Sequence, residues 1–322
     1  MDKHSPSLRR VRPFSLRFWI TALVLVLLAA VPAYSQANHQ PFLISFFSRV
    51  MIFSLAASGL NLIVGFGGLV SFGHALYIGL GAYAVGILSA NGIHDGSIHL
   101  VAGILGAVIV GTVTGAICLR ATGVSFIMIT LAFAQMFFFL TYSLQQYGGD
   151  DGLRIAARSH FSGFDMGQPA TLYWFILAAC VLVMLLVYRL SHARLGMVLR
   201  GCKSNEARMV SLGFPTLRYK LVAYVISANI CMLAGFFLGN LTQFTSPAYL
   251  SWNVSGDLLV MTVLGGLGTV TGPVIGAIVL LCCEELLKNW TVHWMAYLGI
   301  GIVVIAIFAR RGLYGSLPSG QR

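Results

Sequence analysis

Apolar runs of about 20 residues recur along almost the whole chain, and they constrain its fold more than any other feature. An α-helix needs a run of this length to cross the hydrocarbon core of a bilayer. Only 9% of the 322 residues are charged and 58% are hydrophobic, whereas a soluble domain carries about 25% charged residues. The composition excludes a water-soluble enzyme and predicts an all-α integral membrane protein, a polytopic bundle of about ten transmembrane helices. The expected spans are residues 18–34, 43–64, 75–91, 99–119, 125–145, 170–189, 219–240, 255–268, 271–287 and 293–309.

The number of spans depends on residues 255–287, an apolar stretch that contains Gly266, Gly268 and Pro273. A single bent span there would give nine crossings instead of ten. Lys and Arg gather at the cytoplasmic ends of membrane helices. With ten spans and a cytoplasmic N-terminus, sixteen of the 20 Lys and Arg residues fall on the cytoplasmic side. This distribution favours ten spans with both termini cytoplasmic, and the basic residues left outside are Arg49, Arg154, Arg158 and Lys288.

The same distribution defines the expected organisation of the chain. Residues 1–17 form a cytoplasmic arm, residues 18–309 a transmembrane domain with a cytoplasmic loop at 191–218, and residues 310–322 a cytoplasmic tail. The net charge of +11 reflects topology, so no nucleic-acid partner is expected. The first span could alternatively be a cleaved signal peptide. The six cysteines are expected to pack as ordinary side chains rather than to form disulfides.

A glycine-rich segment interrupts the second and third spans. Seven glycines lie between Gly59 and Gly81, together with polar residues at membrane depth. Backbone that leaves the helix inside a bilayer must be buried in protein or must line water, and transporters often place substrate pathways in such segments. Alternatively, the glycines only allow helices to approach closely. We expect a substrate pathway or gate formed by Asn61, Gly65, Gly68, Ser71, Gly73, His74, Tyr77, Gly81 and Tyr83. His74 by itself is expected to be a hydrogen-bonded packing or interface residue, and no metal site is expected.

A second glycine-rich segment, residues 265–277, has a similar composition. A double glycine, a hydroxyl residue and a further glycine follow in the order that is also found at residues 67–73. Two corresponding broken elements in the two halves of a chain are typical of transporters with a structural repeat. Three Gly-x-x-x-Gly pairs, which predict close helix crossings, lie at Gly111 and Gly115, Gly235 and Gly239, and Gly272 and Gly276.

Two polar loops are candidates for contacts with partners. The outer loop at residues 147–154 carries Asp150, Asp151 and Gly152. Two adjacent carboxylates lack the alternating oxygen ligands of a calcium loop, so this loop contacts a partner, guards the outer mouth or is a solvated turn. The cytoplasmic loop contains a short predicted helix at residues 206–213, ended by its glycine with Pro215 just beyond. That helix could dock on a soluble subunit, or it could lie on anionic lipid.

Several motifs are absent from the sequence. It contains no Gly-x-x-x-x-Gly-Lys-Ser/Thr phosphate loop, no His-Glu-x-x-His and no Gly-x-Ser-x-Gly. We therefore expect no catalytic residues, no cofactor and no enzyme activity in this chain. Apart from Asp257, the spans are expected to hold almost no ionisable groups, whereas a proton- or sodium-driven carrier usually needs them. The driving energy is therefore expected to come from elsewhere.

Taken in order, these residues resemble the permease family of branched-chain amino-acid ABC importers, and specifically its M-type subunit. The resembling blocks run from about residue 57 to 280 and include residues 59–62, Gly73-His74, residues 130–133, 148–153, 206–213, 218–228 and 265–273. The resemblance implies an importer in the bacterial inner membrane that takes up branched-chain or hydrophobic amino acids. The implied partners are a homologous second permease, two cytoplasmic ATPase subunits that bind ATP, a periplasmic solute-binding protein, the small-molecule substrate and membrane lipid.

The resemblance also implies roles for particular residues. Glu206, Ala207, Leu212 and Gly213 would carry the ATPase stroke to the spans, Thr130 would join the pathway, and the loop at 150–152 would face the binding protein. The chain departs from the family pattern at residues 208–209, and at Leu69, where a Gln is usual. Uptake of urea, short amides or a sugar-type solute stays open within the family. A self-contained secondary carrier is the alternative from another class.

Overall fold

The computed structural model describes residues 16–161, 164–165, 167–308 and 312–315. Most of the predicted cytoplasmic arm and tail therefore lies outside the described residues. Six of the described helices are long and apolar enough to cross a membrane, and two shorter apolar helices accompany them. The protein is accordingly an all-α multi-pass membrane protein. The helices are α1 (Leu16–Ala37), α2 (Pro41–Asn61), α3 (His74–Ala90), α4 (Gly96–Cys118), α5 (Val124–Ser143), α6 (Pro169–His192), α7 (Arg194–Ser204), α8 (Glu206–Ser211), α9 (Thr216–Thr242), α10 (Trp252–Gly265), α11 (Gly272–Trp290) and α12 (Trp294–Phe308).

Each of the ten predicted spans coincides with one described helix, and α7 and α8 lie in the predicted cytoplasmic loop. The alternative of a single bent span at 255–287 does not agree with the structure, because α10 and α11 are separate helices. Between them, residues 266–271 form a turn in which Gly266 and Gly268 adopt φ of 121° and 74°. Backbone at these angles strains side chains with a Cβ, which explains the glycines.

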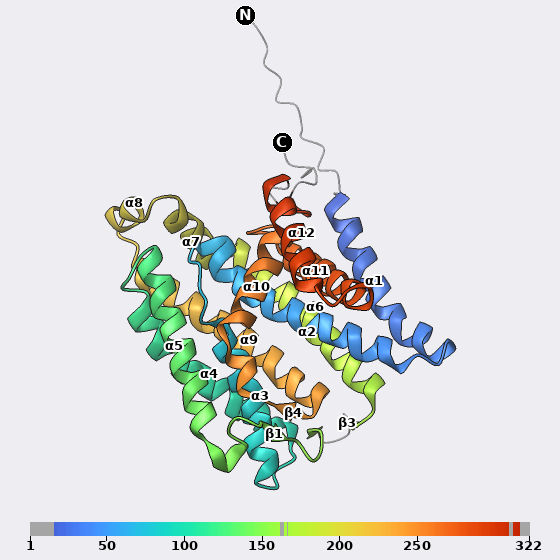
Figure 1. Ribbon diagram of the computed structural model, residues 1–322. Coiled ribbons are helices and arrows are strands. Elements are labelled where there is room, and N and C mark those ends of the chain that lie inside the picture. Colours follow the sequence, from blue (N-terminus) through green and yellow to red (C-terminus); the bar gives the residue numbers. More distant parts are fainter. Residues whose placement is uncertain (1–15, 162–163, 166, 309–311, 316–322) are drawn as a thin grey trace, which may run out of the picture.

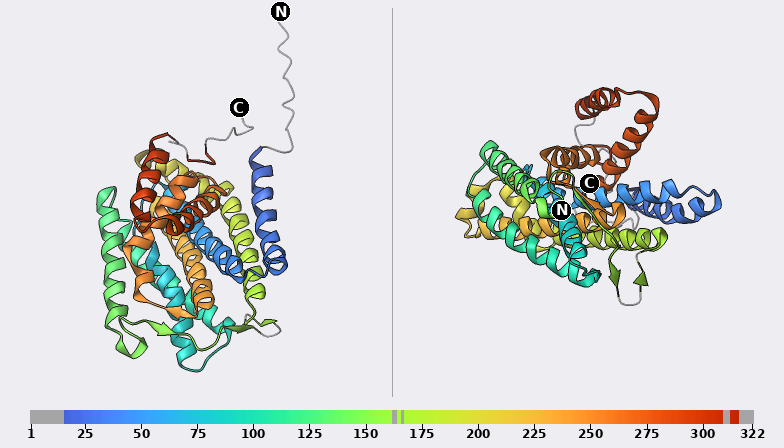
Figure 2. Two further views of the ribbon diagram at one scale, coloured as in Figure 1. Left: turned by 45° about the vertical axis from the view of Figure 1, so that its right-hand side comes forward. Right: turned by 60° about the horizontal axis from the view of Figure 1, so that its bottom comes forward.

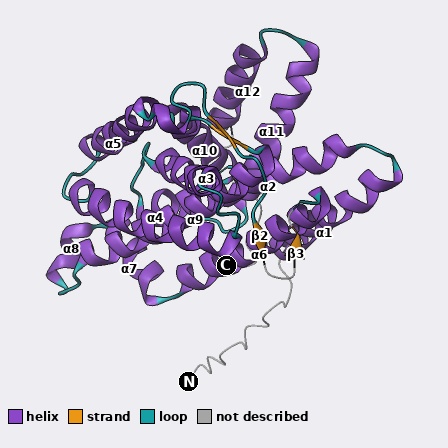
Figure 3. Cartoon of the chain, turned by 90° about the horizontal axis from the view of Figure 1, so that it is seen from below, coloured by secondary structure: helices purple, strands orange, loops and turns teal. Residues whose placement is uncertain are grey.

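The loop at residues 191–218 and the loop at residues 147–154 lie at opposite ends of the bundle. Figure 1 places α7 and α8 at one end and the strands β1 (Leu153–Arg154) and β4 (Phe244–Thr245) at the other. β1 and β4 pair antiparallel, as do β2 (His160–Phe161) and β3 (Phe164–Asp165). These short strands and the one-turn helices η2 (Gln145–Tyr147) and η3 (Pro247–Leu250) were not expected from the apolar runs. Figure 3 shows the loops viewed along the bundle.

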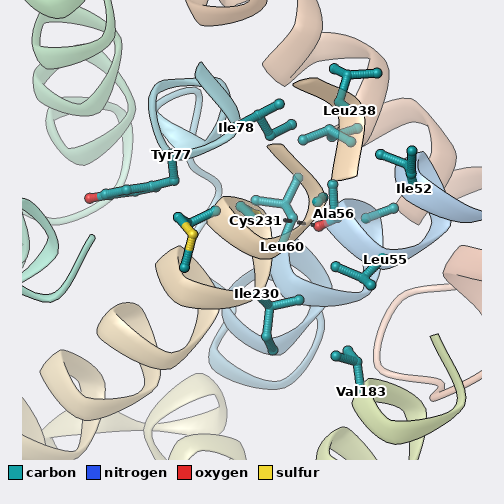
Figure 4. Packing of buried hydrophobic residues seen from close by; sticks show 14 of the residues in the cluster. Ile52, Leu55, Ala56, Leu60, Tyr77, Ile78, Val183, Ile230, Cys231 and Leu238 are labelled. Atoms are coloured by element: carbon teal, nitrogen blue, oxygen red, sulfur yellow. Dashed lines mark hydrogen bonds between the residues drawn. The ribbon is translucent and has the colours of Figure 1, made fainter. Parts of the chain in front are cut away.

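Helix α9 forms the centre of the core and packs against α2, α3 and α4. Cys231 of α9 is fully buried, and its thiol donates a hydrogen bond to the carbonyl of Ala56 in α2. Figure 4 shows this contact among the surrounding aliphatic side chains. By contrast, α1 and α5 expose most of their length. The hairpins α1–α2 and α11–α12 project from the bundle in different directions (Figure 2).

The Gly-x-x-x-Gly pairs lie where helices touch, as predicted. A methyl group at Gly235 would overlap the backbone carbonyl of Ile78 in α3, and one at Gly276 would overlap the carbonyl of Met261 in α10. The pair in α4 faces α9. Because bilayer lipid is as apolar as the side chains, close packing of this kind supplies much of the attraction between membrane helices.

Candidate functional site

The first glycine-rich segment is a broken element inside the bundle. Helix α2 continues into a π-helical turn, η1 (Leu62–Phe66), and residues 68–73 then leave the helix before α3 begins at His74. Gly68 adopts φ of 71°, which favours glycine. The side chains of Asn61, Ser71 and His74 are fully buried. The segment is thus sheltered by protein, as the absence of hydrogen-bonding partners in lipid requires.

The two glycine-rich segments that look alike in the sequence meet in the structure. The Asn61 side chain accepts a hydrogen bond from the amide of Gly268 at 3.0 Å and donates one to the carbonyl of Thr269 at 2.7 Å. A methyl group at Gly65 would overlap the backbone of Gly268. Asn61 therefore fastens the end of α2 to the turn between α10 and α11.

A lysine of the loop at residues 191–218 also reaches the broken element. The Nζ atom of Lys203, in the last turn of α7, donates a hydrogen bond to the carbonyl of Gly65 at 2.8 Å. The aliphatic stem of Lys203 lies against Gly68, where an added Cβ would be 2.9 Å from Cγ. Sequence reasoning missed Lys203, because nothing near it in the chain indicates which carbonyl it binds.

The non-helical residues 68–73 are hydrogen-bonded to α5. The amide of Phe72 donates to the hydroxyl of Thr130 at 3.3 Å, and the amide of Gly73 donates to the hydroxyl of Ser71 at 3.2 Å. A Cβ added at Gly73 would lie 3.0 Å from the carbonyl oxygen of Thr130. Thr130, which the family resemblance placed in the pathway, is thus next to the predicted pathway residues.

His74 lies between two serines. Its Nδ1 atom is 2.9 Å from the hydroxyl of Ser71, and its Nε2 atom is 3.0 Å from the hydroxyl of Ser227 in α9. Ser227 donates its single proton to the carbonyl of Gly59 at 2.6 Å, so its oxygen accepts from Nε2–H, and Nδ1 accepts from Ser71. A neutral imidazole satisfies every partner, which agrees with the expectation of a hydrogen-bonded packing residue.

The remaining pathway candidates are also buried. The hydroxyl of Tyr77 is hydrogen-bonded to Thr114 at 2.8 Å and to Tyr224 at 3.2 Å. Gly81 packs against the carbonyl of Met232, and the Tyr83 side chain is 4% exposed. In this conformation the candidates pack against one another and against α9, so the contacts favour gating over direct lining of a solute path.

Helices α3 and α10 are both short for a membrane crossing. At about 1.5 Å per residue, the 14 residues of α10 span roughly 21 Å, less than the roughly 30 Å hydrocarbon core. The N-termini of α3 and α10 lie together, because the hydroxyl of Ser255 accepts a hydrogen bond from the amide of Ala75 at 2.9 Å. Discontinuous helices whose N-termini lie inside the bilayer are typical of transporter binding regions.

The short helix predicted at residues 206–213 is confirmed as α8. Asn205 caps it by accepting from the amide of Arg208 at 3.0 Å, and Gly213 follows with φ of 83°. Glu206 forms an ion pair with Lys220, whose side chain is 7% exposed. The coupling candidates Ala207 and Leu212 are exposed. Apolar side chains that stand open at this end of the bundle include Val210, Leu212 and Phe214.

The backbone holds the loop at residues 147–154 in place. Asp150 and Asp151 are exposed, and Gly152 adopts φ of 78° directly before β1. A methyl group at Gly152 would overlap the carbonyl of Thr245 in β4. The pairing of β1 with β4 therefore fixes the position of both carboxylates at the end opposite α8.

The expectation of almost no ionisable groups in the spans besides Asp257 has three exceptions. Arg49 lies in α2, and Glu284 and Glu285 lie in α11. All three fall within the ranges expected to span the membrane.

Comparison with known proteins identifies the family to which this chain belongs. The family described as branched-chain amino acid transport system / permease component matches residues 42–308, and the chain belongs to this family. The high-affinity branched-chain amino acid transport system permease protein LivM of Escherichia coli (strain K12) is 26% identical over 288 residues, which cover 82% of this chain and 68% of LivM. LivH of the same organism is 24% identical over 252 residues, covering 73% of this chain and 81% of LivH.

A sugar permease is also similar over part of the chain. The xylose/arabinose import permease protein XylH of Sulfolobus acidocaldarius is 26% identical over 161 residues, which cover 45% of this chain and 43% of XylH. No solved structure matches the chain. These relatives are transport permeases, and the M-type resemblance seen in the sequence agrees with the family match.

Proposed function

We propose that the chain is a permease subunit of an ABC importer that moves branched-chain or other hydrophobic amino acids across the bacterial inner membrane. The ten helices that coincide with the predicted spans cross the membrane, and both termini are cytoplasmic. Two cytoplasmic ATPase subunits bind and hydrolyse ATP, a homologous second permease completes the pathway, and a periplasmic binding protein delivers the solute. Family membership supports this proposal.

The observation that carries the mechanism is the bond between Lys203 and the Gly65 carbonyl. It joins the loop that docks the ATPases to the broken element at the heart of the bundle. Alternating access requires two conformations whose populations ATP binding shifts. Movement of α7 and α8 changes the position of Lys203, and with it the junction between η1 and the turn at 266–271.

The exposed apolar residues around α8 support ATPase docking. Leu212 is 66% exposed and Val210 is 56% exposed, and surface patches of this kind mark interaction sites. The ion pair between Glu206 and Lys220 fastens α8 to the start of α9. A push on α8 therefore reaches α9, the central helix, as well as η1.

The direct test is uptake by the assembled complex. The chain would be expressed with the products of the neighbouring genes, reconstituted into proteoliposomes and supplied with labelled L-leucine. We expect accumulation that requires ATP and the secreted binding protein and that persists when an ionophore removes the proton gradient. Uptake that ignores ATP and stops with the ionophore would instead identify a self-contained secondary carrier.

A further inference from the structure

Helix α6 carries a continuous apolar stripe on its exposed face. The stripe consists of Trp174, Ala178, Leu182, Leu185 and Tyr188, which are all exposed. They follow one another at intervals of three or four residues, which places side chains on one side of a helix. Tryptophan and tyrosine are enriched where a membrane meets water, and here they stand at the two ends of the stripe. The stripe is therefore suited to contact with lipid acyl chains.

Basic side chains begin where the apolar stripe ends. Arg189 is the only Lys, Arg, Asp or Glu residue in α6, and it lies in the last turn together with His192. Both are exposed, and residues three apart are neighbours on a helix surface. The rings of His192 and Tyr188 lie 4.5 Å apart. The basic end of α6 thus directly adjoins the aromatic end of the stripe.

The first turn of α7 packs against this end of α6. A methyl group at Gly196 would overlap the backbone carbonyl of Ser191. The guanidinium of Arg200 donates a hydrogen bond to the same carbonyl at 2.8 Å. Arg194, the first residue of α7, and Arg200 are both exposed. Arg194 and Arg200 therefore join Arg189 at the junction between the two helices.

The surrounding sequence supplies almost no negative charge to balance these arginines. Residues 189–220 include seven Lys and Arg residues and one acidic residue, Glu206. Glu206 pairs with Lys220. Within the part of the chain that the structure describes, no ion pair includes an arginine of the junction. Basic side chains beside a membrane surface attract anionic lipid headgroups.

We infer that the junction of α6 and α7 binds an anionic phospholipid, with its phosphate on Arg189, Arg194 and Arg200 and its acyl chains along the exposed stripe of α6. A guanidinium donates two parallel hydrogen bonds to phosphate oxygens. An acidic protein surface would match the arginines but not the adjoining apolar stripe, whereas a phospholipid matches both. The surface around α8 follows the opposite end of α7, roughly 16 Å away (Figure 1). Lipid and ATPase subunits therefore have separate places.

A lipid at this junction acts on the broken element through α7. The lipid fixes the first turn of α7, and the last turn carries Lys203 with its hydrogen bond to the carbonyl of Gly65. The inference does not depend on which solute the chain carries. It requires only that the exposed face of α6 lies in a bilayer.

The test measures lipid binding to the full chain, purified in detergent and stripped of lipid. Dioleoylphosphatidylglycerol supplies an anionic headgroup, dioleoylphosphatidylcholine a zwitterionic one with the same acyl chains, and inorganic phosphate the anion alone. Native mass spectrometry counts the bound lipid, and the thermal unfolding midpoint reports stabilisation. We expect phosphatidylglycerol to bind at least tenfold more tightly than phosphatidylcholine and to raise the midpoint, whereas phosphate alone leaves the midpoint unchanged.

Variants locate the site at the junction. Arg189→Gln combined with Arg194→Gln should weaken phosphatidylglycerol binding at least tenfold, and lysine at both positions, which keeps the charge, should weaken it less. Arg120→Gln is the matched control, because Arg120 is also an exposed arginine just after the end of an apolar helix, α4, and lies outside the junction. This control should bind phosphatidylglycerol within twofold of the unmodified chain.

Four outcomes would overturn the inference. They are equal binding of the two lipids, an equal loss in Arg120→Gln, competition by phosphate as strong as that by phosphatidylglycerol, and a double glutamine variant that keeps its lipid but no longer co-purifies with the ATPase subunits. The last would assign the arginines to a protein partner. Should the glutamine variant fail to fold, salt titration of the unmodified chain decides, because screening must weaken the binding of phosphatidylglycerol. Binding that ignores salt contradicts the inference.

Discussion

The ammonium group of Lys203 donates a hydrogen bond to the carbonyl oxygen of Gly65 at 2.8 Å, across 138 positions of sequence. A carbonyl in a regular α-helix is occupied by an amide four residues further along the chain. Where η1 ends and residues 68–73 leave the helix, carbonyls lose that partner. The broken element is therefore completed by a side chain from the loop at residues 191–218, which makes its geometry dependent on that loop.

A methyl group at Gly65 should disrupt the junction between the two broken elements. It would overlap the Asn61 side chain and the backbone of Gly268, and overpacking of this kind costs about 1–3 kcal/mol. Gly67→Ala is the matched control, because an added Cβ would lie 3.8 Å from Leu199 at an ordinary φ of −89°. We expect Gly65→Ala, and not Gly67→Ala, to lower the thermal unfolding midpoint of the purified chain in detergent. Equal midpoints would show that the junction is loosely packed.

Removal of the Asn61 amide should separate α2 from the turn at 266–271. Asn61→Ala leaves the amide of Gly268 and the carbonyl of Thr269 without their partner, and each buried unsatisfied group costs about 1–3 kcal/mol. Asn91→Ala removes one bond to the carbonyl of Ile87 at an exposed position and should cost about 0.5 kcal/mol or less. Chemical unfolding of both variants measures the difference, and a loss at Asn61 no larger than that at Asn91 contradicts the assignment.

The two ends of the bundle should respond to different partners. Leu212→Asp places a charge on the exposed apolar surface around α8 and should reduce co-purification of the ATPase subunits at least tenfold. The double variant Asp150→Asn, Asp151→Asn should retain the ATPases and weaken the stimulation of ATP hydrolysis by the binding protein. Quantitative subunit ratios and stimulated hydrolysis measure both effects. Loss of the ATPases from the outer-loop variant would show that the proposed orientation of the chain is wrong.

The pH dependence of maleimide labelling at Cys202 should report on the packing of α7. Burial raises the pKa of this thiol, while the nearby Lys220 ammonium lowers it and the Glu206 carboxylate raises it. A raised pKa leaves less thiolate at neutral pH, and the thiolate is the reactive form. In a chain that retains Cys202 alone, maleimide labelling should be slower at pH 7 than labelling of an exposed Ser204→Cys control. The difference should shrink as the pH rises toward the pKa, and identical rates at every pH would mean that Cys202 is open to solvent.

The positions of the helices along the chain could be predicted because they follow from local preferences. Each apolar run of about 20 residues is suited to lipid rather than water. Gly213 and Pro215 end α8 through backbone geometry alone. The expected breaks at residues 61–73 and 266–271 rest on the same local reasoning. Sequence alone also indicated that broken backbone must be sheltered by protein, and the burial of Asn61 and Ser71 agrees.

The contacts that join these elements could not be predicted in the same way. Asn61 and Thr269 are separated by 208 positions, and no local pattern states that the two glycine-rich segments face one another. Pairing across the fold depends on helix packing angles, which a single sequence does not contain.

The coupling of ATP hydrolysis to uptake tests the central claim most directly. In proteoliposomes that contain the whole complex, the number of leucine molecules imported for each ATP hydrolysed would be compared for the unmodified chain, Lys203→Met and Lys203→Arg. We predict that Lys203→Met assembles and hydrolyses ATP within threefold of the unmodified complex but imports at least tenfold less leucine per ATP. Lys203→Arg should recover part of the coupling, because it restores a donor to the Gly65 carbonyl. An unchanged ratio in Lys203→Met would contradict the account, because the broken element would then move without its link to the cytoplasmic loop.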